Sequence, residues 1–130
     1  MPVPRIRVVA AEIEQNGSFL ITQRRAEAEL PNLWEFPGGR VREGESDADA
    51  LRRTLRDRLD VDVQIGHKLL ALAHDYQGYS LDFVVYRCAL GGTPRVARVQ
   101  DLRWVAPADF EDYAFPTADQ ATIDALLRDG

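Results

Sequence analysis

Residues whose types and spacing could do chemistry gather in the segment 30–45, LPNLWEFPGGRVREGE, and in the stretch that follows it. The pair Gly38-Gly39 frees backbone amides and carbonyls at a sharp bend, and five residues separate Gly39 from Glu45. A predicted helix begins directly after Glu45, at Ser46. A glycine-rich bend above the start of a helix is typical of sites that hold an anionic group such as phosphate.

These residues also have an interpretation without chemistry. In the predicted helix, Arg53 stands four residues from Asp49 and four from Asp57, and such pairs commonly cover a solvated helix face. A glycine and a glutamate at this spacing would be weak evidence on their own. The long run, at its distance from a helix with an N-cap, favours the functional interpretation.

The run resembles the Nudix box, the signature of the Nudix family: a glycine, five residues, a glutamate, seven residues, Arg-Glu, an aliphatic residue, any residue, Glu-Glu, any residue, a glycine and an aliphatic residue. The matching positions hold Gly39, Glu45, Arg53, Leu55 and Val61. The resemblance extends to the MutT-type branch, whose members degrade nucleoside triphosphates. Segments similar to that branch are QRR at 23–25, LWEFPGG at 33–39, HDY at 74–76, LRWV at 102–105 and YAFPTADQATIDAL at 113–126.

The resemblance implies a divalent metal, Mg²⁺ or Mn²⁺, held by a glycine carbonyl and by carboxylates on one face of the helix, one of which can also orient the attacking water. The implied ligands here are the carbonyl of Gly39, the carboxylate of Asp57 and, from a nearby loop, Asp101. Catalytic roles are implied for Glu45, Arg53 and Asp57. Glu45 is expected to anchor Arg53 in a salt bridge.

The helix departs from the box where the family places its metal-binding carboxylates. Thr54 and Arg58 replace glutamates, and Asp60 replaces the closing glycine, so two of the three helix carboxylates are missing. Thr54 has no charge for a hard cation, and Arg58 would repel one. We therefore expect the metal site to be weakened or lost, or filled only when substrate brings Mg²⁺ with it. Arg58 could instead contact a phosphate directly, because its planar fork suits phosphate oxygens. A third alternative is a displaced metal site rebuilt from Glu43, Asp47 or Asp101.

Substrate-binding residues are also implied by the resemblance. Arg25, at the end of a predicted strand, is expected to contact substrate phosphate, with Arg24 on the other face. Phe36 is a candidate for stacking on a base, although aromatic residues near strand ends more often pack in a core. Asp119 matches a base-reading position, where an ionised carboxylate would select an edge rich in hydrogen-bond donors. A helix start at Thr117 would equally favour an acidic residue there. Further stacking candidates are Tyr76 and Tyr79.

The elements that must position these residues follow from residue patterning. Strands are predicted at 6–13 and 19–23, joined by a tight turn at Asn16-Gly17, then near Trp34 within the long loop 26–45, and at 61–73, 81–90 and 96–105. Leucines at every fourth position predict a helix over 46–59, Pro107 begins a short helical turn, and a last helix begins at Thr117. This pattern predicts one α/β domain over residues 1–130, with a mixed β-sheet sandwiched between helices. The resemblance implies that this is the Nudix fold.

Composition excludes several classes of function. The 130 residues, 45% apolar and 28% charged, suit one globular domain. Sixteen basic and 21 acidic residues give a net charge of -5, so no global positive field favours a nucleic-acid polymer or an anionic membrane, and any phosphate must be held locally. The single Cys88 cannot form an intrachain disulfide, and no apolar run is long enough to span a bilayer, so we expect a cytoplasmic protein.

Two hypotheses on function follow. The first is a MutT-like Nudix protein that binds a nucleoside triphosphate or a nucleoside diphosphate derivative, with metal-assisted pyrophosphohydrolysis weak or altered. The alternative is a catalytically silent Nudix module that acts as a nucleotide sensor or an interaction platform. In both, the partner is a small-molecule nucleotide, and a homodimer is an option. The sequence leaves open whether the protein is an enzyme and which base it takes.

Overall fold

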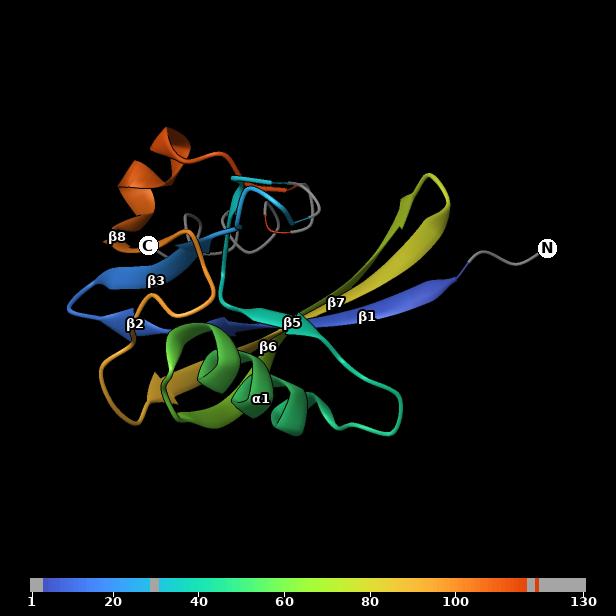
Figure 1. Ribbon diagram of the computed structural model, residues 1–130, viewed down its shortest axis with the longest axis horizontal. Helices are drawn as coiled ribbons and strands as arrows, with labels where there is room; N and C mark the ends of the chain where they lie inside the picture. The colour runs from blue at the N-terminus through green and yellow to red at the C-terminus, as the bar shows by residue number, and fades with distance from the viewer. Residues whose placement is uncertain (1–3, 29–30, 117–118, 120–130) are drawn as a thin grey trace.

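The computed structural model describes residues 4–28, 31–116 and 119. Within these ranges the chain forms strands, an α-helix and a 3₁₀-helix, arranged as in Figure 1. Their bounds are β1 Arg5–Glu12, β2 Glu14–Gln15, β3 Ser18–Gln23, β4 Trp34–Glu35, β5 Gly38–Arg40, α1 Asp47–Leu59, β6 Val63–Tyr76, β7 Tyr79–Leu90, β8 Asp101–Val105 and η1 Pro107–Asp112.

A mixed sheet with a helix packed on it forms the centre of the fold, which confirms the predicted fold class. The strand order is β5-β1-β7-β6, with β1 parallel to β7 and antiparallel to β5. Successive residues of β1 face opposite sides: Val9 and Ala11 pack in the core beside α1, and Ala10 packs in the core on the other side. The unbroken apolar run at residues 8–11 of β1 is therefore explained by burial on both faces.

The other strands form a second sheet, in which β3 pairs with β2, β4 and β8. In Figure 1 this sheet and η1 lie on the side away from α1. The turn at Asn16-Gly17 is present, with φ of 54° and 82°, but it joins β2 to β3 rather than β1 to β3. The hairpin is shorter than predicted because β1 bonds to β5 and β7. The strand pairing with β3 is formed by residues 14–15, next to a hydrogen bond from the N–H of Leu20 to the carbonyl oxygen of Ile13 at 3.0 Å.

Helix α1 begins and ends for local reasons that the sequence contains. Ser46 is its N-cap, and the Oγ atom of Ser46 accepts a hydrogen bond from the backbone N–H of Asp49 at 3.1 Å. Leu51 and Leu55 lie on its buried face. Asp60 ends the helix in the left-handed conformation, with φ 51° and ψ 47°. Glycine adopts this conformation most easily, which gives a physical reason for the closing glycine of the Nudix box.

The predicted strand over 96–105 is wrong in its first half. Within this range only residues 101–105 form a strand, β8, which pairs with β3. Upstream of β8, the backbone N–H groups of Ala97 and Arg98 donate to the carbonyl oxygen of Arg58 at 3.1 and 2.9 Å. The last carbonyls of a helix have no partner within the helix. The chain before β8 satisfies two of them, since the N–H of Arg95 also donates to the carbonyl oxygen of Leu59 at 2.7 Å, and this bonding replaces a strand ladder.

The long loop before α1 carries the two short strands β4 and β5, of which the sequence predicts only the first. Glycines are poor strand formers, so Gly38-Gly39 gave no strand signal. The close approach of β5 to β1 requires them: a Cβ atom built on Gly38 would lie 2.0 Å from the carbonyl oxygen of Val9. The glycine pair therefore holds the loop against the central sheet.

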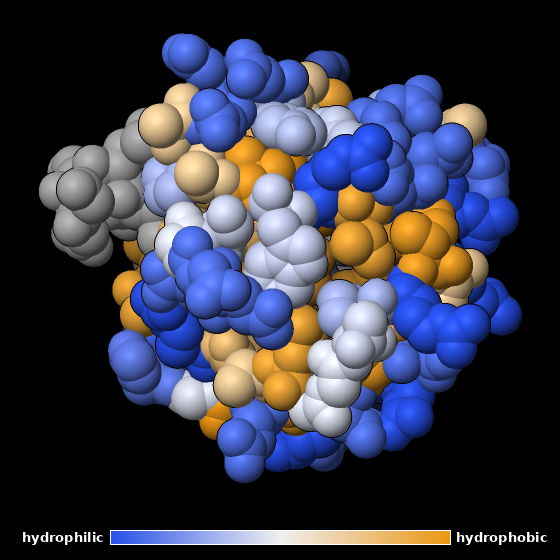
Figure 2. All heavy atoms as spheres, turned by 90° about the vertical axis from the view of Figure 1, so that its left-hand side faces the viewer, coloured by the Kyte–Doolittle hydropathy of each residue, from blue (hydrophilic) through white to orange (hydrophobic). Residues whose placement is uncertain are grey.

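The helix predicted from Thr117 lies outside the described residues. None of the helices in the described ranges combines the length and the apolar character that crossing a membrane requires. On the face seen in Figure 2, hydrophobic side chains lie in small groups between hydrophilic ones.

Candidate functional site

A cavity of about 370 Å³ lies between β1, β5, β7, the loop after β3 and the last turn of α1. Its size is within the range of small-molecule sites, about 300–1,000 Å³. The structure brings eight of the predicted candidate residues to this cavity: Arg25, Phe36, Gly39, Asp57, Arg58, Tyr76, Tyr79 and Asp119. Glu45, Arg53 and Asp101 are not among the described residues that line it.

Arg58 directs its guanidinium group into the bend of the glycine pair. Its Nη1 atom donates a hydrogen bond to the carbonyl oxygen of Gly38 and lies 3.7 Å from Oε1 of Glu35. The sequence suggested the carbonyl of Gly39 as a metal ligand, whereas the carbonyl engaged here is that of Gly38. The guanidinium group thus contacts a carbonyl oxygen and faces a carboxylate, and these are the two types of ligand that a hard metal ion would use.

Thr54 lies beneath the same bend and is buried. Its hydroxyl donates to the carbonyl oxygen of Leu51 within the helix at 3.3 Å. A Cβ atom built on Gly39 would lie 2.8 Å from Cγ2 of Thr54 and 3.1 Å from Nη2 of Arg58. The bend therefore packs tightly on the two residues that replace glutamates, and only glycine fits at position 39.

The surviving helix carboxylate is also engaged by an arginine. Oδ1 of Asp57 lies 3.4 Å from Nε of Arg98, and both residues line the cavity. Nowhere in the described chain do three or more His, Cys, Asp or Glu side chains gather in a way that could hold a metal ion. With Thr54 uncharged, Arg58 on the Gly38 carbonyl and Asp57 paired, the residues present do not fit Mg²⁺.

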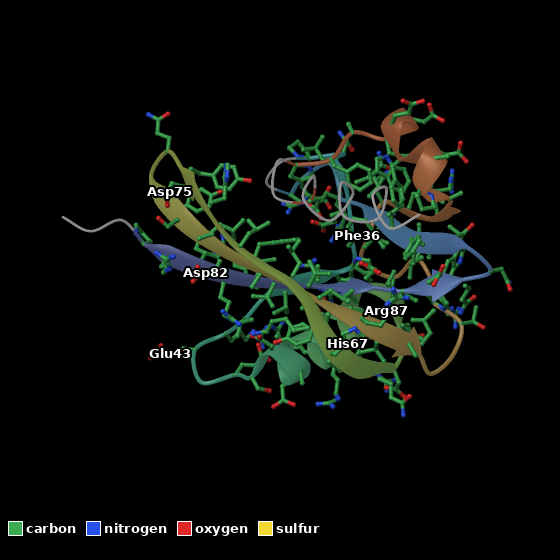
Figure 3. All side chains as sticks on the ribbon, turned by 180° about the vertical axis from the view of Figure 1, so that it is seen from behind. Phe36, Glu43, His67, Asp75, Asp82 and Arg87 are labelled. Carbon is green, nitrogen blue, oxygen red and sulfur yellow. The ribbon has the colours of Figure 1, made fainter. Side chains whose placement is uncertain are left out.

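The carboxylates considered for a displaced metal site, all in the described part of the chain, do not gather into a group that could hold a metal ion. Asp101 accepts hydrogen bonds from the backbone N–H of Leu102 and from Arg103, both at 2.8 Å. Asp47 accepts two hydrogen bonds from Arg7, at 2.8 and 2.7 Å. Figure 3 shows Glu43 pointing outward from the loop that precedes α1. None of these three carboxylates is among the described residues of the cavity wall.

Glu45 and Arg53 form the salt bridge that the resemblance implies, and it braces the loop before α1. Arg53 donates from Nε and Nη2 to the two carboxylate oxygens of Glu45, each at 2.8 Å, and Nη2 also reaches the carbonyl oxygen of Arg40 at 2.8 Å. Hydrogen bonds from Arg53 and from the backbone N–H of Arg42 lower the pKa of Glu45 to about 2. The pair stabilises the backbone of the site from outside the cavity.

Two acidic groups line the cavity, the buried Asp119 and the partly buried Glu35. Asp119 is 3% exposed, and its Oδ1 accepts a hydrogen bond from the backbone N–H of Phe36 at 3.4 Å. Burial and the nearby charge of Glu35 raise the pKa of Asp119 well above its ordinary value. Burial also raises the pKa of Glu35, against the opposing charges of Arg24 and Arg58. The raised pKa shifts Asp119 toward its neutral form, which can donate as well as accept a hydrogen bond, whereas the ionised form only accepts.

Aromatic rings also line the cavity. Phe36 is buried, stacks against Phe115 at a centroid distance of 5.9 Å and meets Phe110 edge-on. Its ring belongs to the core while also contributing to the cavity wall. Tyr76 and Tyr79, from the tip of the β6–β7 hairpin, stack on each other at 5.1 Å and line the cavity as well. They offer apolar surface suited to a planar ring.

Arg24 and Arg25 both line the cavity, whereas alternation along a strand placed them on opposite faces. The alternation does not apply because β3 ends at Gln23, before either arginine. Arg24 donates from Nε to Oε2 of Glu35 at 2.9 Å, and Arg25 pairs with Glu27 near the surface. Sequence reasoning missed Glu35 and Arg98 as site residues. Glu35 lies within the LWEFPGG run and could have been found there, but Arg98 reaches the site through tertiary contacts that leave no local signal.

Comparison with known proteins gives consistent matches over nearly the whole chain. The family model described as "NUDIX domain" matches residues 8–125. The CTP pyrophosphohydrolase of Escherichia coli K12 is 32% identical over 123 residues, which cover 94% of this chain and 91% of that protein. The 8-oxo-dGTP diphosphatase of the same organism is 26% identical, covering 88% and 89%. The solution structure of the E. coli ORF135 protein superposes with a TM-score of 0.84 at 31% identity, covering 97% of this chain and 91% of that one.

Proposed function

We propose a nucleotide-binding function for this chain, which belongs to the Nudix family. The ligand is a nucleoside triphosphate or a nucleoside diphosphate derivative, and its pyrophosphohydrolysis is weak because the metal position is occupied by a side chain. One observation carries the proposal: the guanidinium group of Arg58 sits on the Gly38 carbonyl beside Glu35. A fixed positive charge there supports binding of phosphate, since a guanidinium fork matches phosphate oxygens.

The lining of the cavity supports the same ligand class. Arginines from α1 and from the loop before β8, Arg58 and Arg98, line the same cavity as the stacked rings of Tyr76 and Tyr79. A nucleotide matches this combination, because its phosphate chain is negatively charged and its base is planar with apolar faces. The named relatives act on CTP and on 8-oxo-dGTP, so these nucleotides are the first candidates to test.

Hydrolysis would proceed by attack of water on a phosphorus atom, releasing pyrophosphate and a nucleoside monophosphate from a triphosphate. The groups that the family uses to assist that attack are replaced or paired here, because Thr54 is uncharged and Asp57 faces Arg98. General-base assistance alone is worth about 10² to 10⁴ in rate. We therefore expect turnover in the native protein to be slower than in a variant with the carboxylates restored.

A second candidate function is a silent module that senses a nucleotide. The Asp57–Arg98 ion pair favours it, because it engages the helix carboxylate that remains. Both candidates share the ligand and differ in turnover, so one experiment separates them.

The experiment compares native protein with a Thr54→Glu, Arg58→Glu double variant. Product formation is measured from CTP, 8-oxo-dGTP and a nucleoside diphosphate derivative with Mg²⁺ or Mn²⁺, and nucleotide binding is measured by calorimetry. Binding by the native protein with slow turnover, and faster turnover in the double variant, are expected. Turnover by the native protein at ordinary enzyme rates would contradict weak hydrolysis. No binding of any nucleotide would overturn the proposal itself.

Because Thr54 is buried, the double variant needs its own check. The single variants and the double variant are compared with native protein by thermal melting before activity is interpreted. If the double variant does not fold, Arg58→Gln alone still tests the proposal, since loss of the guanidinium charge should weaken nucleotide binding.

A further inference from the structure

We propose that Arg98, which lies outside the helix motif, forms a two-arginine phosphate clamp with Arg58 and lets the cavity bind a polyphosphate chain without a divalent metal. The inference rests on the nucleotide-binding function proposed above and adds a residue and a metal-free mode of binding to it. Arg98 stands in the loop before β8, 40 positions after Arg58 in the chain.

The backbone ties the two arginines together. The carbonyl oxygen of Arg58 accepts hydrogen bonds from the N–H groups of Ala97 and Arg98, at 3.1 and 2.9 Å. Two residues on, the N–H of Gln100 donates to the carbonyl oxygen of Gln23 at 2.9 Å, so the loop is also held on β3. The base of the Arg98 side chain is therefore fixed relative to that of Arg58, as a clamp requires.

The side chain of Arg98 is suited to exchange its present carboxylate partner, Asp57, for a phosphate. Its Nε atom lies 3.4 Å from Oδ1 of Asp57, and the two side chains are 66% and 51% exposed. An ion pair as exposed as this one contributes little to stability, so exchanging its carboxylate for a phosphate costs little. A guanidinium group has five N–H donors in a planar fork, which can engage a phosphate in two places at once.

The charge of the cavity wall agrees with an anionic ligand, although the whole chain carries -5. Five arginines and three acidic residues stand among its described lining residues. The arginines are Arg24, Arg25, Arg40, Arg58 and Arg98. The acidic residues are Glu35, Asp57 and Asp119. The positive excess lies where a metal ion would otherwise supply the charge that balances phosphate.

The chain contains a matched comparison for Arg98. Arg95 lies on the same loop, is 75% exposed and faces Asp60 at 3.8 Å, so it too is a surface arginine beside an aspartate at the end of α1. Arg95 is not among the described residues that line the cavity. If Arg98 were only a surface ion-pair partner, the two arginines would behave alike on substitution.

The test measures binding of CTP and of inorganic tripolyphosphate by calorimetry in EDTA, for native protein and for R98A, R98K, R95A and D57N. Arg98→Ala should weaken both ligands about tenfold, the loss expected for one charge-assisted contact. Arg98→Lys should recover part of that loss, and Arg95→Ala should stay within about twofold of native, because it lies off the cavity. Asp57→Asn should tighten binding, because it removes a negative charge beside the phosphates and releases Arg98.

The outcomes separate this inference from the function on which it rests. If R98A and R95A bind equally well, or if D57N weakens binding, the clamp is wrong while nucleotide binding stands. Binding of CTP by native protein only when Mg²⁺ is present also overturns the clamp. Failure of native protein to bind CTP with or without Mg²⁺ removes the support for the proposed function as well. Thermal melting of each variant shows that a loss of affinity is not a loss of fold.

Discussion

Asp57 and Arg58 are neighbours on the last turn of α1, and the helix sends their side chains in different directions. With 3.6 residues per turn, successive side chains are rotated by about 100°. Arg58 reaches inward to the Gly38 carbonyl, and Asp57 reaches the loop arginine Arg98. At the scale of single residues, each guanidinium group thus meets an oxygen acceptor, which is a carbonyl for Arg58 and a carboxylate for Arg98.

The salt bridge between Glu45 and Arg53 predicts a pH dependence of stability at the same scale. The pKa of Glu45 is lowered from its ordinary 4.5 to about 2 in the folded protein, so its contribution is complete above pH 4.5 and is lost as the pH falls through about 2. Glu45→Gln should therefore lower the urea midpoint at pH 7, and the difference from native should narrow between pH 4.5 and 2.

The control for this measurement is Glu43→Gln, the same change in the same loop at a side chain that points outward (Figure 3). We expect no comparable loss at pH 7 in this variant. A difference between Glu45→Gln and native protein that is constant from pH 7 to pH 2.5 would show that the ion pair is not its cause.

At the scale of elements, the loop before β8 and the strand β5 both meet the end of α1. The helix stops at Asp60, its last carbonyls bond to the loop before β8, and both Arg58 and Arg98 are placed by that contact. The glycine bend of β5 packs on the same turn. This short region thus positions Arg58 and Arg98 in the wall of the cavity.

The left-handed conformation of Asp60 predicts a stabilising substitution. A residue other than glycine at φ 51° is strained, so Asp60→Gly should raise the free energy of unfolding by about 0.5 to 1 kcal/mol. Urea unfolding measures this directly. Arg95→Ala serves as the control, because it removes the exposed contact with Asp60 and leaves the backbone conformation unchanged. Destabilisation by Asp60→Gly would mean that the ion pair outweighs the relief of strain.

At the scale of the whole molecule, the cavity depends on parts that are distant in sequence. The cavity is lined by strands of the central sheet, by Glu35 of the second sheet and by the β6–β7 hairpin, which extends beyond the body in Figure 1. The net charge of -5 is opposed locally by the arginines of that cavity. We therefore expect this cavity to favour a small anion over an extended polyanion, which the net negative charge of the chain would repel.

Ligand binding at this site predicts a distinctive pattern of thermal stabilisation. A ligand present at about 100 times its Kd stabilises the native state by about 2.7 kcal/mol, which corresponds to a rise in Tm of about 10 °C for a domain of this size. We expect CTP in EDTA to raise the Tm and Mg²⁺ alone to leave it unchanged. A rise with Mg²⁺ alone would indicate a metal site in the native protein.

Local patterns predicted much of the fold and some of the site. Ser46 and the leucines of α1, the turn at Asn16-Gly17 and three strands of the central sheet, β1, β6 and β7, follow from short-range rules of capping, turn geometry and alternation. The Glu45–Arg53 salt bridge was predictable from the family motif. The loop before β8 was not, because its backbone bonds to the end of α1 instead of to a strand.

The sequence by itself determined which chemical groups are available: a glycine bend, a capped helix, and a threonine and an arginine where the family places glutamates. These are properties of residue type and spacing along one segment. Only the tertiary structure decided how the groups are paired, since it set Arg58 on the Gly38 carbonyl, Arg98 against Asp57 and Asp119 beneath Phe36. Each of these contacts joins residues 20 or more positions apart, and long-range pairing depends on how the packed sheets, helix and loops meet.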